Sequence, residues 1–525
     1  MKNLSMNCSF LRMGARTNNL FFEASSFNLK NFLININWER DEKFSLWMER
    51  LWPILHEKYH HLQLYSSTLG LFYCLCNQYK ENVVEGLFRR EGKHPPLRDC
   101  LDQDETWRFL KNGFYLIEYL TFWINGDFSD EELKSENNQL DYGGISSNQL
   151  QELFYIFGKI FNECGIKSLD INEFNKSNTS DRRNEIKKLY REHGVDDSVT
   201  LIQKNDGKCL GAIDILEGAA RIIDLSKIDE YKSRFSKDKD ILEKFERKLN
   251  ENNLHSDAYD FYSSCVNIEN IDKVWTNSMF LVLCDYAINI PLPLFDSPET
   301  ALVLYSPQWF LPQHRFIHLL LILKRLSANN KLFVNFDPDE LQKFEEKGYS
   351  FRELDNNSID DWNELIVDFY EVLEKESFLP SPLTLAKEFL SITSGIEEKR
   401  NNLYSLNYFL TKFKIACQIR LECPIFICYP QIVKWLDKNL YLKLSNQLET
   451  SVMMFDKRVL SRENFAEDDV ISDVKRYIYT TALSHLFDYE KIQISDIISN
   501  IPILKEEDIK HILESLFGND ILKYV

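Results

Sequence analysis

The chain has 525 residues, and 81 Asp and Glu against 62 Lys and Arg give it a formal net charge of −19. This acid excess excludes a protein that binds nucleic acid or an anionic membrane through a basic surface. Because 44% of the residues are apolar and only 17 are Gly and 14 Pro, a collagen-like or largely disordered chain is also excluded. The length predicts more than one domain's worth of folded mass.

The eleven cysteines are scattered and contain no CxxC pair. This spacing speaks against a zinc ribbon or a thioredoxin-like site and predicts reduced, buried thiols. The first residues lack the apolar segment of a secretory signal. The most apolar stretches, at 279–295 and 316–323, are interrupted or too short to span a bilayer. We therefore expect a cytoplasmic protein.

The first elements in chain order are a short β segment and a helix. Residues 9–12 and 20–23 flank a turn region and predict a β-hairpin. From residue 41 onward, apolar residues recur every three or four positions and predict a helix, which ends or kinks within residues 66–70. A second aromatic-rich helix is expected at 107–128, with its aromatic stripe in the core.

The remaining predicted elements are mainly helical. Residues 210–225 predict a buried helix, whereas the polar segments at 170–197 and 227–253 predict exposed chain. Helices are expected to begin at Asp337-Pro338 and at Ser381-Pro382, and an amphipathic helix at 505–517 should end at Gly518.

The expected fold class is therefore mainly α with a small β component (α+β). It holds a zincin-like metal site on helices and a helical C-terminal region. We expect a division near residue 330. Residues 1–330 would form a metallopeptidase-like region, and residues 331–525 a helical region of unknown role.

The histidines carry the chemical signal, because three of only ten lie within residues 56–61. The segment His56-Glu57-Lys58-Tyr59-His60 is an HExxH pattern on a predicted helix. Residues at i and i+4 share a helix face, so His56 and His60 can bind one metal ion. Glu57 can then take a proton from a water molecule activated by the metal and pass it to a leaving amine.

A catalytic zinc site needs a third protein ligand, and Glu217 is our first candidate. It lies in the apolar 210–225 segment, where a narrow polar stripe on a buried helix requires compensation by ion pairs or by a metal. Arg221, with Asp214 or Asp224, would be outer hydrogen-bond partners. The alternative is an internal salt-bridge network in a core helix.

Glu81 and Glu85 compete with Glu217 for the same role. An unbroken helix from His60 would carry Glu81 about 30 Å away, since each residue adds about 1.5 Å. These two carboxylates are candidates only if the chain reverses direction within residues 66–70.

Four other residues are candidates for the site, and a structural role remains open for each. Gln63 continues the face of His56 and His60 and is placed to bind a ligand or substrate. His61 lies four residues after Glu57 and is placed to orient it. Two residues offer a hydrogen-bond donor to a developing oxyanion, namely His255 and Tyr259. A second i, i+4 pair, His314 and His318, lacks an adjacent Glu and is interpreted as structural.

On these residues the chain resembles the HExxH zinc metallopeptidases, of the gluzincin type if Glu217, Glu81 or Glu85 is the third ligand. The wider pattern His56–Gln63 followed far downstream by residues 216–220 is also similar to uncharacterised bacterial HExxH proteins. The resemblance implies a thermolysin-like mechanism with a zinc cofactor, Glu57 as general base and acid, and a His or Tyr at the oxyanion. The long separation between His60 and Glu217 departs from the family pattern.

We therefore expect a zinc-dependent peptidase that acts on a protein or peptide substrate, with neither nucleic acid nor membrane as partner. Residues 331–525 would restrict access or bind a partner protein or regulator. Two alternatives stay open. One is a non-catalytic helical interaction protein with a structural or degenerate histidine cluster. The other is a different hydrolase or oxygenase that uses the same His/His/Glu metal site.

Overall fold

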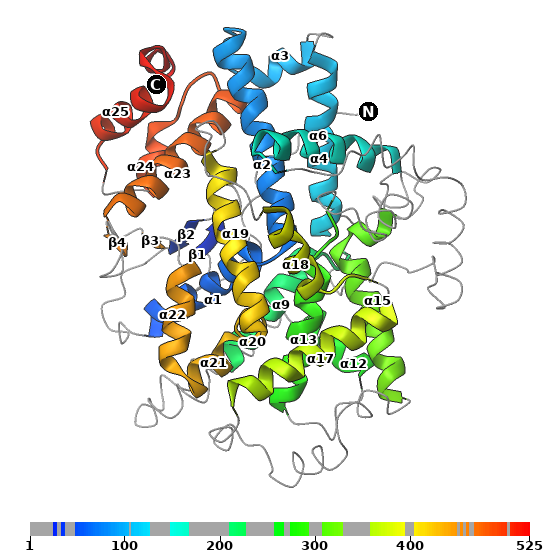
Figure 1. Ribbon diagram of the computed structural model, residues 1–525. Coiled ribbons are helices and arrows are strands. Elements are labelled where there is room, and N and C mark those ends of the chain that lie inside the picture. The colour runs from blue at the N-terminus through cyan, green and yellow to red at the C-terminus, as the bar shows by residue number, and fades with distance from the viewer. Residues whose placement is uncertain are drawn as a thin grey trace.

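The computed structural model describes residues 25–28, 33–36, 48–103, 107–126, 147–166, 209–226, 257–266, 273–292, 307–328, 358–377, 379–393, 404–448, 452–454, 458–460, 467–500 and 504–525. Helices make up most of this part of the chain (Figure 1), so the prediction of a mainly α protein is confirmed. None of the helices described here is both long enough and apolar enough to cross a membrane. The expected segments at 9–12, 20–23, 170–197 and 227–253, and the Asp337-Pro338 helix start, lie outside the described residues.

The helices before residue 330 include the two that carry the HExxH and Glu217 residues. They are α1 (Met48–Tyr65), α2 (Thr68–Glu85), the π-helical turn η1 (Gly86–Arg90), α3 (Leu97–Gln103), α4 (Arg108–Asn125), α6 (Ser147–Glu163), α9 (Ala212–Leu225), α12 (Asp257–Cys265), α13 (Lys273–Ile288), the short helix η4 (Pro307–Phe310) and α15 (Pro312–Ala328).

The helices after residue 330 continue the same packed arrangement. They are α17 (Ile359–Ser377), α18 (Pro382–Thr393), α19 (Tyr404–Glu422), α20 (Pro424–Cys428), α21 (Pro430–Leu436), α22 (Lys438–Leu448), α23 (Glu467–Asp488), α24 (Ile494–Asn500), α25 (Glu506–Phe517) and the terminal short helix η7 (Asn519–Tyr524).

Four short strands form one sheet that joins distant parts of the chain. β1 (Ser25–Asn28) pairs antiparallel with β2 (Leu33–Ile36), and β3 (Val452–Met454) pairs antiparallel with β4 (Arg458–Leu460). β2 lies parallel to β3, with Ile34 opposite Val452. The strand order is therefore β1-β2-β3-β4, and the sheet joins the two ends of the sequence.

The two halves of the sequence also share one hydrophobic core. α1 packs against α9, α2 and α19, and α13 packs against α15, α9 and α20. At the end of the molecule that holds the C-terminus, α23 contacts α2 (Figure 1), and the ring of Tyr479 stacks on Phe517. The described helices on the two sides of residue 330 are in contact. The division near that residue stays a prediction.

The chain turns sharply between α1 and α2, as the sequence predicts for residues 66–70. Ser67 is the N-cap of α2, and its hydroxyl accepts a hydrogen bond from the Gly70 amide at 3.3 Å. Gly70 lies so close to α1 that a Cβ atom would stand 1.8 Å from the carbonyl oxygen of Leu64. This close approach lets α2 leave α1 directly after the HExxH helix.

Helix α9 begins where the end of α4 approaches it. The N-cap is Gly211, where a Cβ atom would lie 2.0 Å from the carbonyl oxygen of Asn125. The Asp214 carboxylate accepts a hydrogen bond from the Gly211 amide at 2.8 Å and closes the first turn. Ala219 and Ala220 are fully buried, which fits the prediction of a buried helix.

Two other predicted helix boundaries are confirmed. α18 begins at Pro382, and the Ser381 hydroxyl accepts a hydrogen bond from the Thr384 amide at 3.2 Å. α25 ends at Phe517, followed by Gly518 with a φ of +82°. Only glycine adopts such a left-handed conformation without steric strain.

The second histidine pair lies inside the core, as a structural role requires. His314 and His318 are 3% and 7% exposed, and His318 packs edge-on against Trp309. Burial lowers the pKa of both imidazoles to about 4, because a buried ring resists protonation.

The Gly70 contact predicts a destabilised Gly70→Ala variant. The new methyl group overlaps a backbone oxygen, so we expect a loss of about 1–3 kcal/mol or more in the free energy of unfolding. Gly86→Ala is the matched control, because Gly86 has helical dihedral angles and open space around its Cα. That change should be neutral or stabilise by about 0.4–1 kcal/mol. Equal unfolding midpoints for the two variants would contradict the close approach.

The buried histidines predict a loss of stability in acid. The unfolded chain protonates each imidazole near pH 6.5, whereas the folded chain resists down to about pH 4. The unfolded state therefore binds more protons in this window, and stability falls as the pH drops through it. In His314→Leu, about 2–2.5 kcal/mol of this acid penalty should disappear between pH 7 and pH 4.5, and the contribution of His318 should remain. Chemical denaturation at pH 7 and pH 4.5 measures the difference, and an unchanged difference would contradict this role for His314.

Candidate metal site

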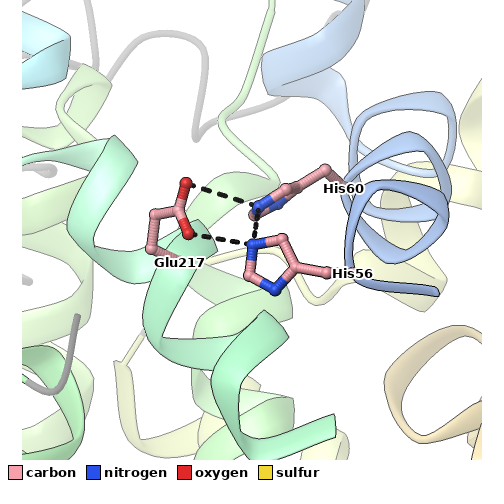
Figure 2. Close-up of side chains that lie close together, drawn as sticks. All are labelled: His56, His60 and Glu217. Atoms are coloured by element: carbon pink, nitrogen blue, oxygen red, sulfur yellow. Dashed lines mark hydrogen bonds and ion pairs between the residues drawn. The ribbon is translucent and has the colours of Figure 1, made fainter. Parts of the chain in front are cut away.

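The side chains of His56, His60 and Glu217 converge on one point between α1 and α9 (Figure 2). The two histidine Nε2 atoms are 3.1 Å apart. Glu217 Oε2 lies 3.2 Å from His56 Nε2, and Glu217 Oε1 lies 3.4 Å from His60 Nε2. The HExxH helix and the Glu217 helix thus supply three potential ligands to one place.

These separations fit a tetrahedral metal ion. Zinc binds histidine nitrogen and carboxylate oxygen at about 2.0–2.2 Å, so ligand atoms at tetrahedral angles stand roughly 3.3–3.5 Å apart. The three observed distances of 3.1, 3.2 and 3.4 Å are close to that range. Among the described residues, this is the one group of three or more His, Cys, Asp or Glu residues whose donor atoms gather this closely.

A hydrogen bond on the far side of each imidazole fixes its orientation. His56 Nδ1 lies 2.7 Å from Asp224 Oδ2, and His60 Nδ1 lies 3.0 Å from Gln63 Oε1. The Gln63 amide nitrogen donates to the carbonyl oxygen of Leu216 at 3.4 Å, which leaves its oxygen to accept from His60. Both Nδ1 atoms therefore carry the proton, and both Nε2 atoms turn a lone pair toward Glu217.

Lone pairs and a carboxylate that face one another require a positive charge between them. Without a metal ion a proton takes this place. Burial opposes a charge on His56, but the carboxylates of Asp224 and Glu217 outweigh it and raise its pKa well above the usual value. Burial also opposes a charge on Glu217, yet His60 and His56 hold the pKa of this carboxyl well below its usual value. The donor set therefore favours a cation.

The three candidate ligands differ in exposure. His60 and Glu217 are 1% and 5% exposed, whereas the His56 side chain is 17% exposed. A substrate or water molecule would therefore reach an open coordination position from the side of the site on which His56 lies. Glu57 is buried beside His56 on α1 and is not one of the three converging groups. This position fits a general base, because a general base acts on the metal-bound water and does not itself bind the metal ion.

The outer residues expected on α9 have two different roles. Asp224 binds His56, and Arg221 lies close enough to Asp224 to interact with its charge. Asp214 instead binds the Gly211 amide at the start of the helix. Of the two acidic candidates, Asp224 is thus the one in contact with a ligand.

The remaining candidates lie away from the three ligands or outside the described residues. The Tyr259 hydroxyl donates to Asn277 at 3.2 Å, not to the cluster. His61 packs against the ring of Tyr65, and burial together with the nearby cations Lys412, Lys58 and Arg476 keeps its pKa well below the usual value. His255 lies outside the described residues.

The alternative third ligands are not part of the cluster. The chain does turn between α1 and α2 at residues 66–70, but α2 leads away from α9 (Figure 1). The Glu85 carboxylate accepts a hydrogen bond from Tyr479 at 3.1 Å and pairs with Arg89 at 3.0 Å. Glu81 lines a small cavity between α2, α4 and α23. Of the three glutamates considered, only Glu217 approaches both histidines.

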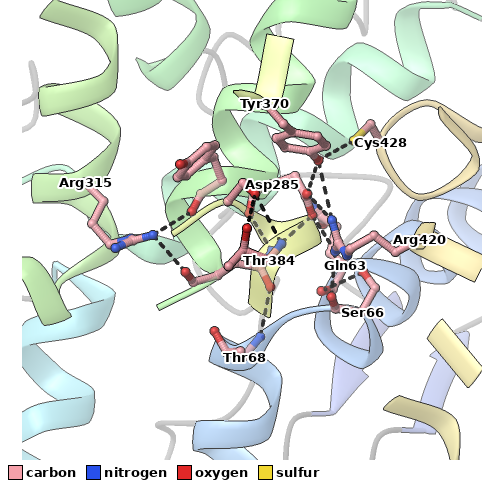
Figure 3. Close-up of polar contacts among 12 residues, drawn as sticks. Gln63, Ser66, Thr68, Asp285, Arg315, Tyr370, Thr384, Arg420 and Cys428 are labelled. Atoms are coloured by element: carbon pink, nitrogen blue, oxygen red, sulfur yellow. Dashed lines mark hydrogen bonds and ion pairs between the residues drawn. The ribbon is translucent and has the colours of Figure 1, made fainter. Parts of the chain in front are cut away.

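Sequence reasoning missed a buried ion pair next to the site. Asp285 on α13 forms it with Arg420 on α19 (Figure 3). Asp285 holds the pKa of Arg420 above its usual value in spite of burial. The sequence does give one signal, because Asp285 is a lone acid in the apolar 279–295 stretch, and a buried acid requires a partner.

Comparisons with known proteins give no relative for this chain. No protein-family model, curated protein or solved structure matches it. The case for a function therefore depends on the geometry of the site.

The cluster predicts metal binding that depends on Glu217. Purified wild-type protein should hold about one zinc ion per chain, measured by elemental analysis, and Glu217→Gln should weaken binding strongly, because it removes the only charged ligand. Glu85→Gln is the matched control and should bind like the wild type. Equal zinc contents in the two variants would contradict Glu217 as a ligand.

Proposed function

We propose that this protein is a zinc-dependent peptidase with His56, His60 and Glu217 as ligands and Glu57 as general base. One observation carries the proposal, namely the convergence of two Nε2 atoms and one carboxylate at 3.1–3.4 Å from one another. The same three residues give the chain its resemblance to the HExxH zinc metallopeptidases of the gluzincin type.

The residues of the chain have separate roles in this reaction. A zinc ion held by His56, His60 and Glu217 would supply Lewis-acid chemistry, by polarising the scissile carbonyl and by lowering the pKa of a water molecule to about 7. Glu57 takes the proton of the attacking water and delivers it to the leaving amine, so that one peptide bond is exchanged for a carboxylate and an amine. Asp224 and Gln63 hold the two imidazoles in place throughout.

The substrate of the proposed enzyme is a protein or peptide segment that reaches the site along the more exposed His56 edge. Neither nucleic acid nor a membrane is a proposed partner, in line with the net charge of −19. The cytoplasm is the proposed location. Buried thiols such as Cys284, Cys417 and Cys428 support it.

A second candidate is a different metal-dependent enzyme on the same ligands. Two histidines and one carboxylate with open positions are also the ligand set of non-haem iron oxygenases. The deep burial of His60 and Glu217 favours this candidate, since a small substrate such as O₂ needs less access than a polypeptide. Iron, instead of zinc, in protein purified without added metal would favour it.

The general-base role predicts that Glu57→Gln separates activity from metal binding. The variant should lose hydrolysis of a casein or peptide-library substrate by about 10²–10⁴-fold, because the amide cannot accept a proton. Its zinc content should equal that of the wild type, because Glu57 is not a ligand.

Glu91→Gln, at an exposed position, is the control for the loss of a carboxylate. Full activity in a zinc-loaded Glu57→Gln variant would contradict the peptidase proposal but would not contradict the metal site.

A further inference from the structure

One buried polar network runs from the C-terminal half of the chain to the HExxH helix (Figure 3). Arg420 on α19 binds both carboxylate oxygens of Asp285 on α13, one of them at 2.9 Å. Tyr370 on α17 donates its hydroxyl hydrogen to the same carboxylate and lies 2.9 Å from the Cys428 sulfur. Asp285 and Arg420 neutralise one another, so the charge of the network is balanced within the protein.

This network contacts α1 at Tyr59 and the residue directly after α1, Ser66, so that one contact lies on each side of His60 in the sequence. The second guanidinium nitrogen of Arg420 donates to the carbonyl oxygen of Ser66 at 2.6 Å. The hydroxyl of Tyr59, one residue before His60, donates to the carbonyl oxygen of Cys428 at 2.8 Å. Both contacts are buried, so water does not compete for them.

The contact at Ser66 continues to the proposed ligands. The Ser66 hydroxyl donates to the carbonyl oxygen of Gln63 at 3.4 Å, and the Gln63 side chain joins His60 to the carbonyl oxygen of Leu216 on α9. Arg420 is thus linked through Ser66 and Gln63 to His60 by hydrogen bonds and one turn of helix.

We propose that Arg420 and Tyr59 are positioning residues that set the rotation of α1, and with it the distance between His60 and Glu217. This inference depends on the metal site proposed above and assigns a role to the C-terminal half, because α17, α19 and α20 supply the network. A metal site requires its ligands to be placed within about 0.5 Å. Two fixed points on either side of His60 limit both the rotation and the sliding of the helix.

The cleanest test is Tyr59→Phe, which keeps the ring and removes only the hydroxyl. Its matched control is Tyr79→Phe, because the hydroxyl of Tyr79 on α2 also donates to a backbone carbonyl, that of Leu110 at 3.2 Å. Zinc affinity is measured on the full chain by competition with a chromophoric chelator. We expect binding about tenfold weaker in Tyr59→Phe and unchanged in Tyr79→Phe.

The second variant addresses Arg420. Replacing Arg420 alone leaves a buried, uncompensated Asp285, and the chain then risks unfolding. The double variant Arg420→Met with Asp285→Leu removes both charges together, which is often neutral for stability, while it deletes the bond to Ser66. Zinc binding should weaken by about 10–100-fold, and Co²⁺ bound in place of zinc should show an altered visible spectrum.

A remote packing defect serves as the stability control for both variants. Leu513→Ala, in the fully buried part of α25, should lower the unfolding temperature without changing zinc affinity or the Co²⁺ spectrum.

The outcomes distinguish this inference from the proposed function. If the wild type binds neither zinc nor iron, the metal site itself is wrong. If the wild type binds zinc and both Tyr59→Phe and the double variant bind it as tightly, with the wild-type Co²⁺ spectrum, then the positioning role is wrong and the metal site stands.

Discussion

The contact between the Glu217 carboxylate and two imidazoles of another helix is the interaction on which the site depends. It requires α9 to lie close against α1, and these two helices are in contact. Gly211 lets the start of α9 meet the end of α4, where a side chain would collide with the carbonyl oxygen of Asn125. Fully buried alanines continue along the helix. Two residues of α9, Glu217 and Asp224, lie opposite the HExxH helix.

Two buried charged clusters lie along the same helical segment, one at the middle of α1 and one at its end, and they differ in charge balance. At the end of α1, Asp285 and Arg420 compensate one another. At the middle of α1, Arg221 lies near Asp224, whereas the contacts of the Glu217 carboxylate within the described part of the chain are with the Nε2 atoms of His56 and His60, whose Nδ1 atoms are bonded to Asp224 and Gln63. An ion pair whose two charges cancel needs no further ion. A carboxylate that faces the lone pairs of two imidazoles does need a cation. This difference explains why one cluster is interpreted as structural and the other as a binding site.

Local patterns in the sequence were enough to predict many of the helices and the residues of the candidate metal site. They did not predict the contacts between residues far apart in the sequence. The i, i+4 spacing of His56 and His60 fixes their common helix face, and the apolar surroundings of Glu217 indicate a buried acid. The end of α1, the start of α18 and the end of α25 follow from serine, proline and glycine signals. By contrast, nothing near Arg420 in the sequence says that its partner is Asp285, 135 residues earlier. The pairing of β2 with β3 is equally long in range.

The parallel pairing of β2 with β3 limits when the complete fold can form during synthesis of the chain. Residues 33–36 cannot find their partner strand until residues 452–454 have left the ribosome, and contacts of such long range form slowly. Arg420 and Cys428, which form the buried hydrogen bonds to Ser66 and Tyr59, are also synthesised late. The HExxH helix, α2 and α9 are all translated well before Arg420 and Cys428. A nascent chain therefore carries His56, His60 and Glu217 before it has the residues that form the buried hydrogen bonds to Tyr59 and Ser66.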